Sequence, residues 1–341
     1  MNSSRILGIG SYLPPGIVTN DDLKDLLNTS DEWIQQRTGI KQRHWVDAST
    51  DIATSDLGLL AAQKALAHAG VDKSEIDLII FATTSPDYDT PGSACTLQAK
   101  LGIPGVPALD IRQQCSGFIY GLSIADQFVR TGLYKKVLLV CAEIQSKGID
   151  LSPRGRDVSV LFGDGAGAIV LGSTSLVTDV RNSDLPHVLC THLGADGRFA
   201  KDLWIEYPGI GHVGSRNSFK EEDQVKYFPQ MNGKTVFVNA AKKMPEILLT
   251  SLESQNLKIE DVDLFVFHQA NIRINEMVAK QLGIPDEKIF NTIELFGNTT
   301  AATIPLGLDE AVRCGKLRSG MLVGSAAFGS GFTWGSALIR W

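Results

Sequence analysis

Short apolar runs alternate with longer stretches in which apolar residues recur at helical spacing. The runs predict buried strands at Leu78–Ala82, Val137–Val140, Ala168–Leu171, Leu264–Phe267 and Leu322–Gly324. The stretches between them predict helices at Asp56–Ala69, Cys115–Thr131, Lys234–Ser254, Asn271–Leu282 and Ala302–Cys314. This alternation favours an α/β fold with buried, largely parallel strands. The first residues, MNSSRILGIGSYLPPG, predict a strand and a turn rather than a secretory signal.

The pattern repeats within the chain. GVDKSEIDLIIFATTS (70–85) and NLKIEDVDLFVFHQAN (256–271) share an acidic turn, an Asp, four apolar residues and a polar end. Asp77 corresponds to Asp263, and in a second matching pair of segments Cys115 corresponds to Asn298. We therefore expect two similar halves, residues 1–175 and 176–341, related by a pseudo-twofold axis. Such an axis would bring Cys115 and Asn298 together, with His268 at the end of a neighbouring strand. The polar composition of residues 196–232 indicates an inserted loop or cap.

Cys115 lies where a strand-like run, Val106–Ile111, turns into the helix that ends at Thr131. The free N–H groups and the dipole at a helix N-terminus favour an anion, so this position predicts a lowered thiol pKa and a nucleophile. The alternative is a small buried apolar residue, which is the common role of a free cysteine.

Composition narrows the class of protein. Hydrophobic residues make up 43% and charged residues 21% of 341 residues, which is ordinary for a globular enzyme, and no apolar run is long enough for a membrane span. Five scattered cysteines suit a reducing cytoplasm. The net charge of −6 argues against general nucleic-acid binding, so an acidic partner would need a local basic patch.

Two kinds of binding motif are missing from the sequence. There is no C-x-x-C or H-E-x-x-H motif for a metal. The segment GDGAG (163–167) lacks the Lys of a phosphate loop, so its glycines favour close backbone packing instead.

Several motifs occur in a fixed order: TSDEWIQQRTGI (29–40), the Cys115 segment, LFGDGAGA, HQANIR, GNTTAATIP and FGSGFTWGSAL. In these motifs the chain closely resembles the β-ketoacyl-acyl carrier protein synthase III group of the thiolase superfamily, from end to end. The resemblance implies a thiolase-like fold with two pseudo-twofold-related halves in α-β-α-β-α layers, and a homodimer. It also implies a catalytic trio of Cys115, His268 and Asn298.

The implied reaction has two stages and needs no cofactor beyond its thioester substrates. Cys115 takes the acyl group of an acyl-CoA, and a malonyl thioester then loses CO2 and condenses with that acyl group. His268 and Asn298 would stabilise the enolate. The backbone N–H groups of Cys115 and Ser330 would form the oxyanion hole, and Phe328 would line the condensation site.

The resemblance also assigns binding roles. Trp33 and Arg37 would hold the CoA adenine, with Arg156 as a second adenine or phosphate contact and Asn271 as a pantetheine contact. Arg273 and Lys280 would dock an acidic acyl carrier protein; the alternative for these basic residues is a solvated surface. An acetyl-specific relative carries Phe at the position of Thr90, so the smaller Thr90 predicts medium or long acyl chains. The alternative is that another side chain, Gln114 or Phe199, fills the acyl pocket.

The sequence departs from the priming enzymes at two places. Arg112-Gln113-Gln114 replaces small residues before the cysteine, and Ser330 replaces a Gly. The Cys115 segment is closer to secondary-metabolism relatives that make alkylquinolones or dialkylresorcinols. The expected role is initiation of fatty-acid synthesis; the alternatives are a related condensation in a secondary pathway, or acyl transfer without condensation.

Overall fold

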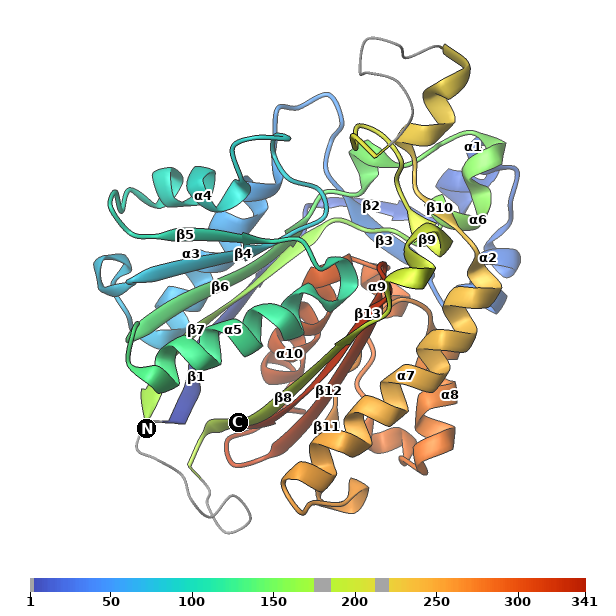
Figure 1. Ribbon diagram of the computed structural model, residues 1–341. Helices are drawn as coiled ribbons and strands as arrows, with labels where there is room; N and C mark the ends of the chain where they lie inside the picture. Colours follow the sequence, from blue (N-terminus) through green and yellow to red (C-terminus); the bar gives the residue numbers. More distant parts are fainter. Residues whose placement is uncertain (1–2, 175–184, 212–220) are drawn as a thin grey trace.

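The computed structural model describes residues 3–174, 185–211 and 221–341 (Figure 1). The predicted boundary between the halves, at 175/176, lies outside the described residues. Five strands from the first half form one sheet: β1 (Ser3–Tyr12), β4 (Leu78–Ala82), β5 (Ala108–Ile111), β6 (Lys136–Glu143) and β7 (Gly165–Thr174). Four strands from the second half form another: β8 (His187–Ala195), β11 (Leu264–Phe265), β12 (Leu322–Gly329) and β13 (Thr333–Arg340).

The two sheets have the same topology. The strand order is β1-β7-β6-β4-β5 in the first and β8-β13-β12-β11 in the second. In each sheet the first two pairings are antiparallel and the following ones are parallel. A parallel bridge between Phe265 and Ile289 extends the second sheet where β5 extends the first. The expectation of largely parallel strands is therefore wrong, because an apolar run that is buried on both faces does not encode strand direction.

The helices complete five layers, as the resemblance implied. The helices α5 (Gly117–Thr131) and α10 (Thr303–Arg313) lie between the two sheets (Figure 1). The outer face of the first sheet carries α3 (Thr54–Ala69) and α4 (Ser93–Leu101), and that of the second carries α7 (Gly233–Ser254) and α8 (Ile272–Leu282). In β4 every side chain is buried, because Leu78, Ile80 and Ala82 face α5 while Ile79 and Phe81 face α3. Both faces of the strand must then be apolar.

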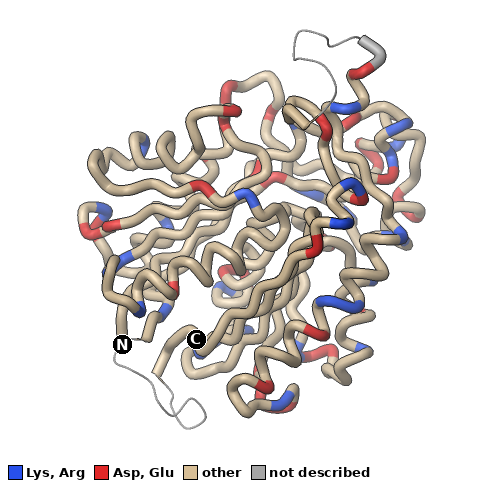
Figure 2. Tube along the Cα trace, viewed as in Figure 1, with Lys and Arg blue, Asp and Glu red and all other residues tan. Residues whose placement is uncertain are grey.

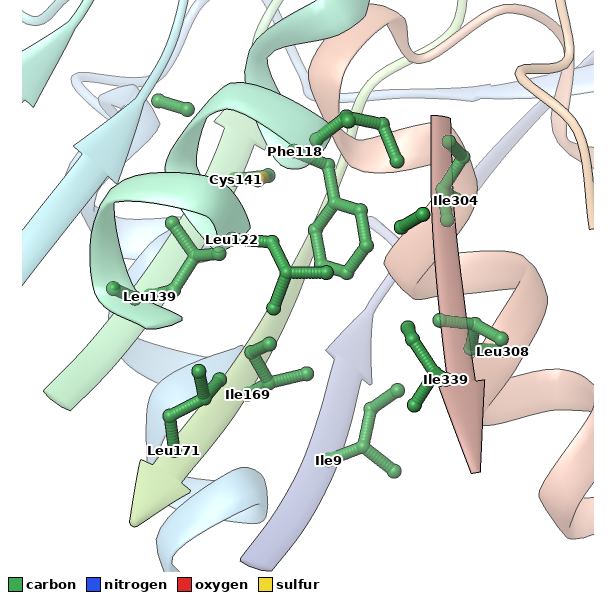
Figure 3. Close-up of a cluster of buried hydrophobic side chains, with 14 of the residues drawn as sticks. Ile9, Phe118, Leu122, Leu139, Cys141, Ile169, Leu171, Ile304, Leu308 and Ile339 are labelled. Carbon is green, nitrogen blue, oxygen red and sulfur yellow. The ribbon is translucent and has the colours of Figure 1, made fainter. Parts of the chain in front are cut away.

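The central layer joins the halves into one core. Figure 3 shows Phe118 and Leu122 of α5 between the strands of the first sheet and Ile304 and Leu308 of α10. Ile339 of the second sheet belongs to the same buried cluster. Because this packing fixes α5 against α10, it also fixes the two chain segments that begin these helices.

The remaining elements surround one end of the layers. They are β2 (Gly16–Thr19), α1 (Lys24–Leu27), α2 (Asp31–Thr38), β3 (Gln42–Trp45), α6 (Arg156–Ser159) and α9 (Ile293–Phe296). The segment predicted as a cap contains the short pair β9 (Leu203–Trp204) and β10 (Gln230–Met231), and its residues 212–220 lie outside the described ones.

The predicted elements are present with shifted ends. The helices agree within about two residues, but Cys115 lies in a 3₁₀ turn, Gln114–Ser116, that precedes α5. The strand predicted at Leu264–Phe267 is only two residues long. Neither β8 nor β13 was predicted, because their apolar and polar residues mix without a clear apolar run. The GDGAG segment packs closely as expected: a Cβ on Gly163 would lie 2.3 Å from the Phe296 carbonyl oxygen.

Candidate active site

The structure brings Cys115, His268 and Asn298 into one pocket of about 400 Å³, together with Phe328 and Gly329. These residues form its buried end: the exposed fractions are 8% for Cys115, 2% for His268 and 5% for Asn298. The other end reaches the surface at Arg37 and Arg273. Apolar side chains make most of the wall between the two ends: Val160, Leu161, Phe162, Leu203, Met231, Val236, Phe237, Ala240 and Met244. The pocket thus combines polar chemistry at its base with a long apolar passage.

Cys115 is held by the turn between β12 and β13. Ser116 Oγ donates to the Thr333 carbonyl oxygen at 3.0 Å, and Gly329 packs directly on Cys115. Burial raises the pKa of the Cys115 thiol to about 12, and the nearby Glu143 carboxylate adds to the rise. The prediction of a lowered pKa is therefore wrong for this site. A helix terminus lowers a thiol pKa, but this thiol is also buried beside the Glu143 carboxylate of β6, and both of these raise the pKa.

His268 follows β11 and continues its pairing, because its backbone N–H donates to the Ala326 carbonyl oxygen at 2.9 Å. The ring Nδ1 lies 2.7 Å from Thr303 Oγ1, at the start of α10. The ring Nε2 is buried and has no hydrogen-bond partner among the described residues. Burial lowers the pKa of His268 to about 3, so the imidazole is neutral near pH 7. A buried ring nitrogen without a partner fits a site that completes its hydrogen bonds with a substrate.

Asn298 joins the two halves at the pocket. It forms an isolated parallel β-bridge with Phe162: its N–H donates to the Leu161 carbonyl at 2.8 Å, and Gly163 N–H donates to its carbonyl at 3.1 Å. In the side chain, Oδ1 accepts the Thr300 N–H at 2.9 Å. That bond orients the amide and leaves its Nδ2 donors for a ligand in the pocket.

Phe328 and Ser330 lie on either side of Gly329. The Phe328 ring packs against Phe332 at 4.8 Å and stacks with Trp334 at 6.5 Å between ring centroids, and it lines the pocket. Ser330 does not line the pocket; its hydroxyl donates to the carbonyl oxygen of Leu203 in β9. The predicted oxyanion role of the Ser330 backbone N–H stays a prediction.

The predicted CoA residues gather at the exposed end. The guanidinium carbons of Arg37 and Arg156 lie 4.3 Å and 5.0 Å from the centre of the Trp33 ring. Asn271 caps the N-terminus of α8 by accepting the Arg273 N–H at 2.9 Å, and it donates to the Arg37 carbonyl oxygen at 2.7 Å. Asn271 therefore links α8 to α2, and both the oxygen and the nitrogen of its side-chain amide form hydrogen bonds. Arg156 itself does not line the pocket.

The two predicted docking residues are exposed on α8. Arg273 lines the pocket entrance, with its guanidinium 5.7 Å from the centre of the Phe237 ring, whereas Lys280 lies near the helix end and outside the pocket. Figure 2 shows basic positions along α7 and on the side that carries α2 and α6, with acidic positions among them. Arg37 and Arg273 are both exposed at the pocket entrance, in a chain whose net charge is negative.

The two predicted acyl-pocket residues are not among the residues that line this pocket. Thr90 is exposed in the loop 83–92, and Gln114 is half-buried beside Cys115 with a positive φ of 45°. Neither lines the pocket within one chain. Sequence reasoning also missed residues that shape the site, including Gly329, Glu143, Thr303, Leu203 and Met231. Of these, only Gly329 carried a pattern that could have indicated a close backbone approach, because it belongs to the glycine run around Ser330.

Two further observations concern residues 3–174, 185–211 and 221–341. In these ranges no group of three His, Cys, Asp or Glu side chains is placed to hold a metal ion. The helices of the same ranges include none that combines the length and the apolar character required to cross a bilayer.

Comparisons with known proteins agree with the geometry. A model of the C-terminal part of 3-oxoacyl-[acyl-carrier-protein] synthase III matches residues 252–341, and a second model of this synthase matches residues 109–197. The β-ketoacyl-[acyl-carrier-protein] synthase III 1 of Vibrio vulnificus is 45% identical over 337 residues, which is 99% of each chain. The chain belongs to the 3-oxoacyl-[acyl-carrier-protein] synthase III family.

Solved structures place the fold in the same family. The synthase III of Aquifex aeolicus superposes with a TM-score of 0.87 at 39% identity, covering 99% of this chain and 100% of that one. The priming β-ketosynthase of the R1128 polyketide pathway gives a TM-score of 0.88 at 33% identity, over 99% and 96% of the two chains. The predicted thiolase-like fold and the synthase III type of acyltransferase are thereby confirmed.

Proposed function

We propose that this synthase III family member joins an acyl group from acyl-CoA to a malonyl thioester by decarboxylative Claisen condensation, as the first condensation of fatty-acid synthesis. One observation carries the proposal. A cysteine from one half meets a histidine and an asparagine from the other half at the buried end of a single apolar passage. The passage runs from exposed residues to buried ones, and its base holds both a nucleophile and donors for a developing negative charge.

In the first half-reaction the Cys115 sulfur attacks the thioester carbonyl. A carbon–sulfur bond forms to Cys115, the bond to the CoA sulfur breaks, and the thiol proton ends on CoA. The backbone N–H groups of Cys115 and Ser330 stabilise the tetrahedral oxyanion. The packing of Gly329 on Cys115 supports this role of Ser330, because Gly329 precedes Ser330 in the chain.

In the second half-reaction the malonyl thioester loses CO2, and His268 and Asn298 stabilise the enolate oxygen. The enolate carbon then attacks the acyl-Cys115 carbonyl, releasing the 3-oxoacyl product and a thiolate that takes up a proton. No general base is needed, because the departure of CO2 supplies the electron pair. Asn298 Nδ2 and the unpartnered His268 Nε2 are the side-chain atoms that support this step.

The substrates reach the site through the exposed end. We assign the CoA adenine and phosphates to Trp33, Arg37 and Arg156, where two guanidinium groups already lie on one indole ring. Arg273 and Lys280 dock an acidic acyl carrier protein that delivers malonate. No cofactor takes part.

A cytoplasmic homodimer completes the proposal. The edge strand β5 pairs only with β4 within the described chain, and Thr83, at the start of the loop 83–92, donates its backbone N–H to the Ile111 carbonyl oxygen of β5 at 3.2 Å. Pairing at this edge in a dimer would let Thr90 of one subunit reach the acyl site of the other.

Acyl transfer without condensation, and a condensation in a secondary pathway, are the two rival functions. The comparisons do not favour the secondary pathway, because the curated relative at 45% identity is a synthase III and the polyketide enzyme is only 33% identical. The decisive experiment supplies acyl-CoA and malonyl-carrier protein labelled at the free carboxyl group. We expect labelled CO2 and a 3-oxoacyl product in equal amounts; acyl-enzyme without CO2 release would support plain acyl transfer.

The variant Asn298→Ala separates the two half-reactions in that experiment. It should acylate Cys115 normally but release CO2 about 10²–10³-fold more slowly, which is the usual effect of removing one such donor. Asn239→Ala is the matched control, because it removes an amide of α7 that does not line the pocket. Equal loss of both half-reactions in Asn298→Ala would contradict the assigned role.

A further inference from the structure

The turn between β12 and β13, taken here with the two strand ends as residues 329–333, contacts both the nucleophile and the cap. On one side Gly329 packs on Cys115, and Thr333 Oγ1 lies 3.3 Å from Ser116 Oγ. On the other side Phe332 exchanges two backbone hydrogen bonds with Asp196, at 2.8 Å and 2.9 Å. The turn therefore connects the cap directly to the residues around Cys115.

One backbone carbonyl group of β9 in the cap, that of Leu203, receives its hydrogen bond from this turn. The Asp202 carbonyl faces β10, because it accepts the Asn232 N–H at 2.8 Å. Carbonyl groups alternate in direction along an antiparallel strand, so the Leu203 carbonyl points away from β10. The hydroxyl of Ser330 donates to that carbonyl oxygen. A glycine at position 330 would leave the Leu203 carbonyl without this donor.

Leu203 is also part of the pocket wall, together with its β10 partner Met231. One residue therefore contacts the passage with its side chain and binds the turn beside Cys115 with its carbonyl. An occupant that fills the passage would contact the Leu203 side chain, whereas a short thioester that reaches only Cys115 would not.

We propose that Ser330 is a positioning residue that makes acylation of Cys115 depend on an occupied passage. Its hydroxyl fixes β9 to the turn, so that a pantetheine arm packed against Leu203 also holds the Ser330 backbone N–H in place for the oxyanion. The residue thus favours full-length pantetheine thioesters over truncated ones. This inference rests on the proposed acylation of Cys115.

The test compares acyl-CoA with the N-acetylcysteamine thioester of the same acyl group, a truncated analogue of the pantetheine arm. The measured quantity is the ratio of kcat/KM for Cys115 acylation by the two donors. We expect Ser330→Ala to lower this ratio by about three- to tenfold, the size of one neutral hydrogen bond. Ser330→Thr keeps a hydroxyl and should keep the ratio.

Ser254→Ala is the matched control, because it also removes a hydroxyl that donates to a backbone carbonyl, 2.8 Å away at the far end of α7. It should leave the ratio unchanged. If Ser330→Ala slows both donors equally, or leaves the ratio at its original value, Ser330 has no role in selecting the donor. A wild-type protein that acylates with neither donor would instead overturn the proposed function.

Discussion

The backbone of Gly329 packs directly on Cys115. A Cβ added at Gly329 would lie 2.8 Å from the Cys115 Cβ and 3.0 Å from its backbone nitrogen, which is closer than such atoms approach without a shift. The close approach brings the end of β12 from the second half against the 3₁₀ turn that precedes α5 in the first. The nucleophile is thus positioned by both halves of the chain.

Gly329→Ala should therefore damage acylation without unfolding the protein. The added methyl group would separate the turn from Cys115, and a displacement of ~1 Å at a catalytic group can lower the rate about 10²-fold. Rapid-quench measurement of acyl-enzyme formation would check this. Gly148→Ala is the control, because a Cβ there meets nothing within 4 Å. Normal acylation in Gly329→Ala would show that the contact is not required.

The raised pKa of Cys115 predicts a characteristic pH dependence. Only the thiolate reacts with iodoacetamide, so with a thiol pKa of about 12 the alkylation rate should rise about tenfold per pH unit from pH 6 to pH 9. Glu143→Gln removes the charge that adds to the rise, and should increase the rate at every pH in this range. Peptide mapping separates Cys115 from the exposed Cys95 and Cys314. A rate that levels off below pH 8 would contradict the raised pKa.

Charge reversal tests the docking surface. Arg273→Glu should weaken the use of malonyl-carrier protein, and most strongly at low salt, because exposed charges act within about 8 Å at physiological ionic strength. Acylation by free acyl-CoA should change less. Lys316→Glu makes the same change of net charge in the connection between α10 and β12, outside the pocket. A matching loss in both variants would indicate a general charge effect rather than docking.

Much of the site could be predicted from the sequence because its polar residues occur in motifs and at corresponding places of an internal repeat. Cys115, His268 and Asn298 are of this kind. Leu203 and Met231 could not be predicted in this way, because the sequence does not distinguish an apolar residue that lines a pocket from one in the core. The thiol pKa was predicted with the wrong sign, since burial and Glu143 depend on the packing of β6, which local sequence does not encode.

Chain length should depend on Thr90. If the loop 83–92 of one subunit closes the acyl site of the other, the small Thr90 leaves room for medium or long chains, each buried methylene contributing about 0.8 kcal/mol. Thr90→Phe should then disfavour dodecanoyl-CoA by roughly 1–3 kcal/mol through overpacking, while acetyl-CoA gains relative to it. Acylation efficiencies for acetyl-, butyryl-, octanoyl- and dodecanoyl-CoA would decide the matter. A wild-type preference for acetyl over octanoyl would refute this account of chain length.

The covalent step at Cys115 is the centre of the account, and intact-protein mass spectrometry measures it most directly. Incubation with octanoyl-CoA should add one acyl group, mapped to the Cys115 peptide, and later addition of malonyl-carrier protein should remove it as a 3-oxoacyl product. Cys95→Ser should behave like the wild type, and Cys115→Ser should gain no mass, because an unactivated hydroxyl is a far weaker nucleophile. An acyl group that remains after malonyl addition, or one that still forms in Cys115→Ser, would contradict the account.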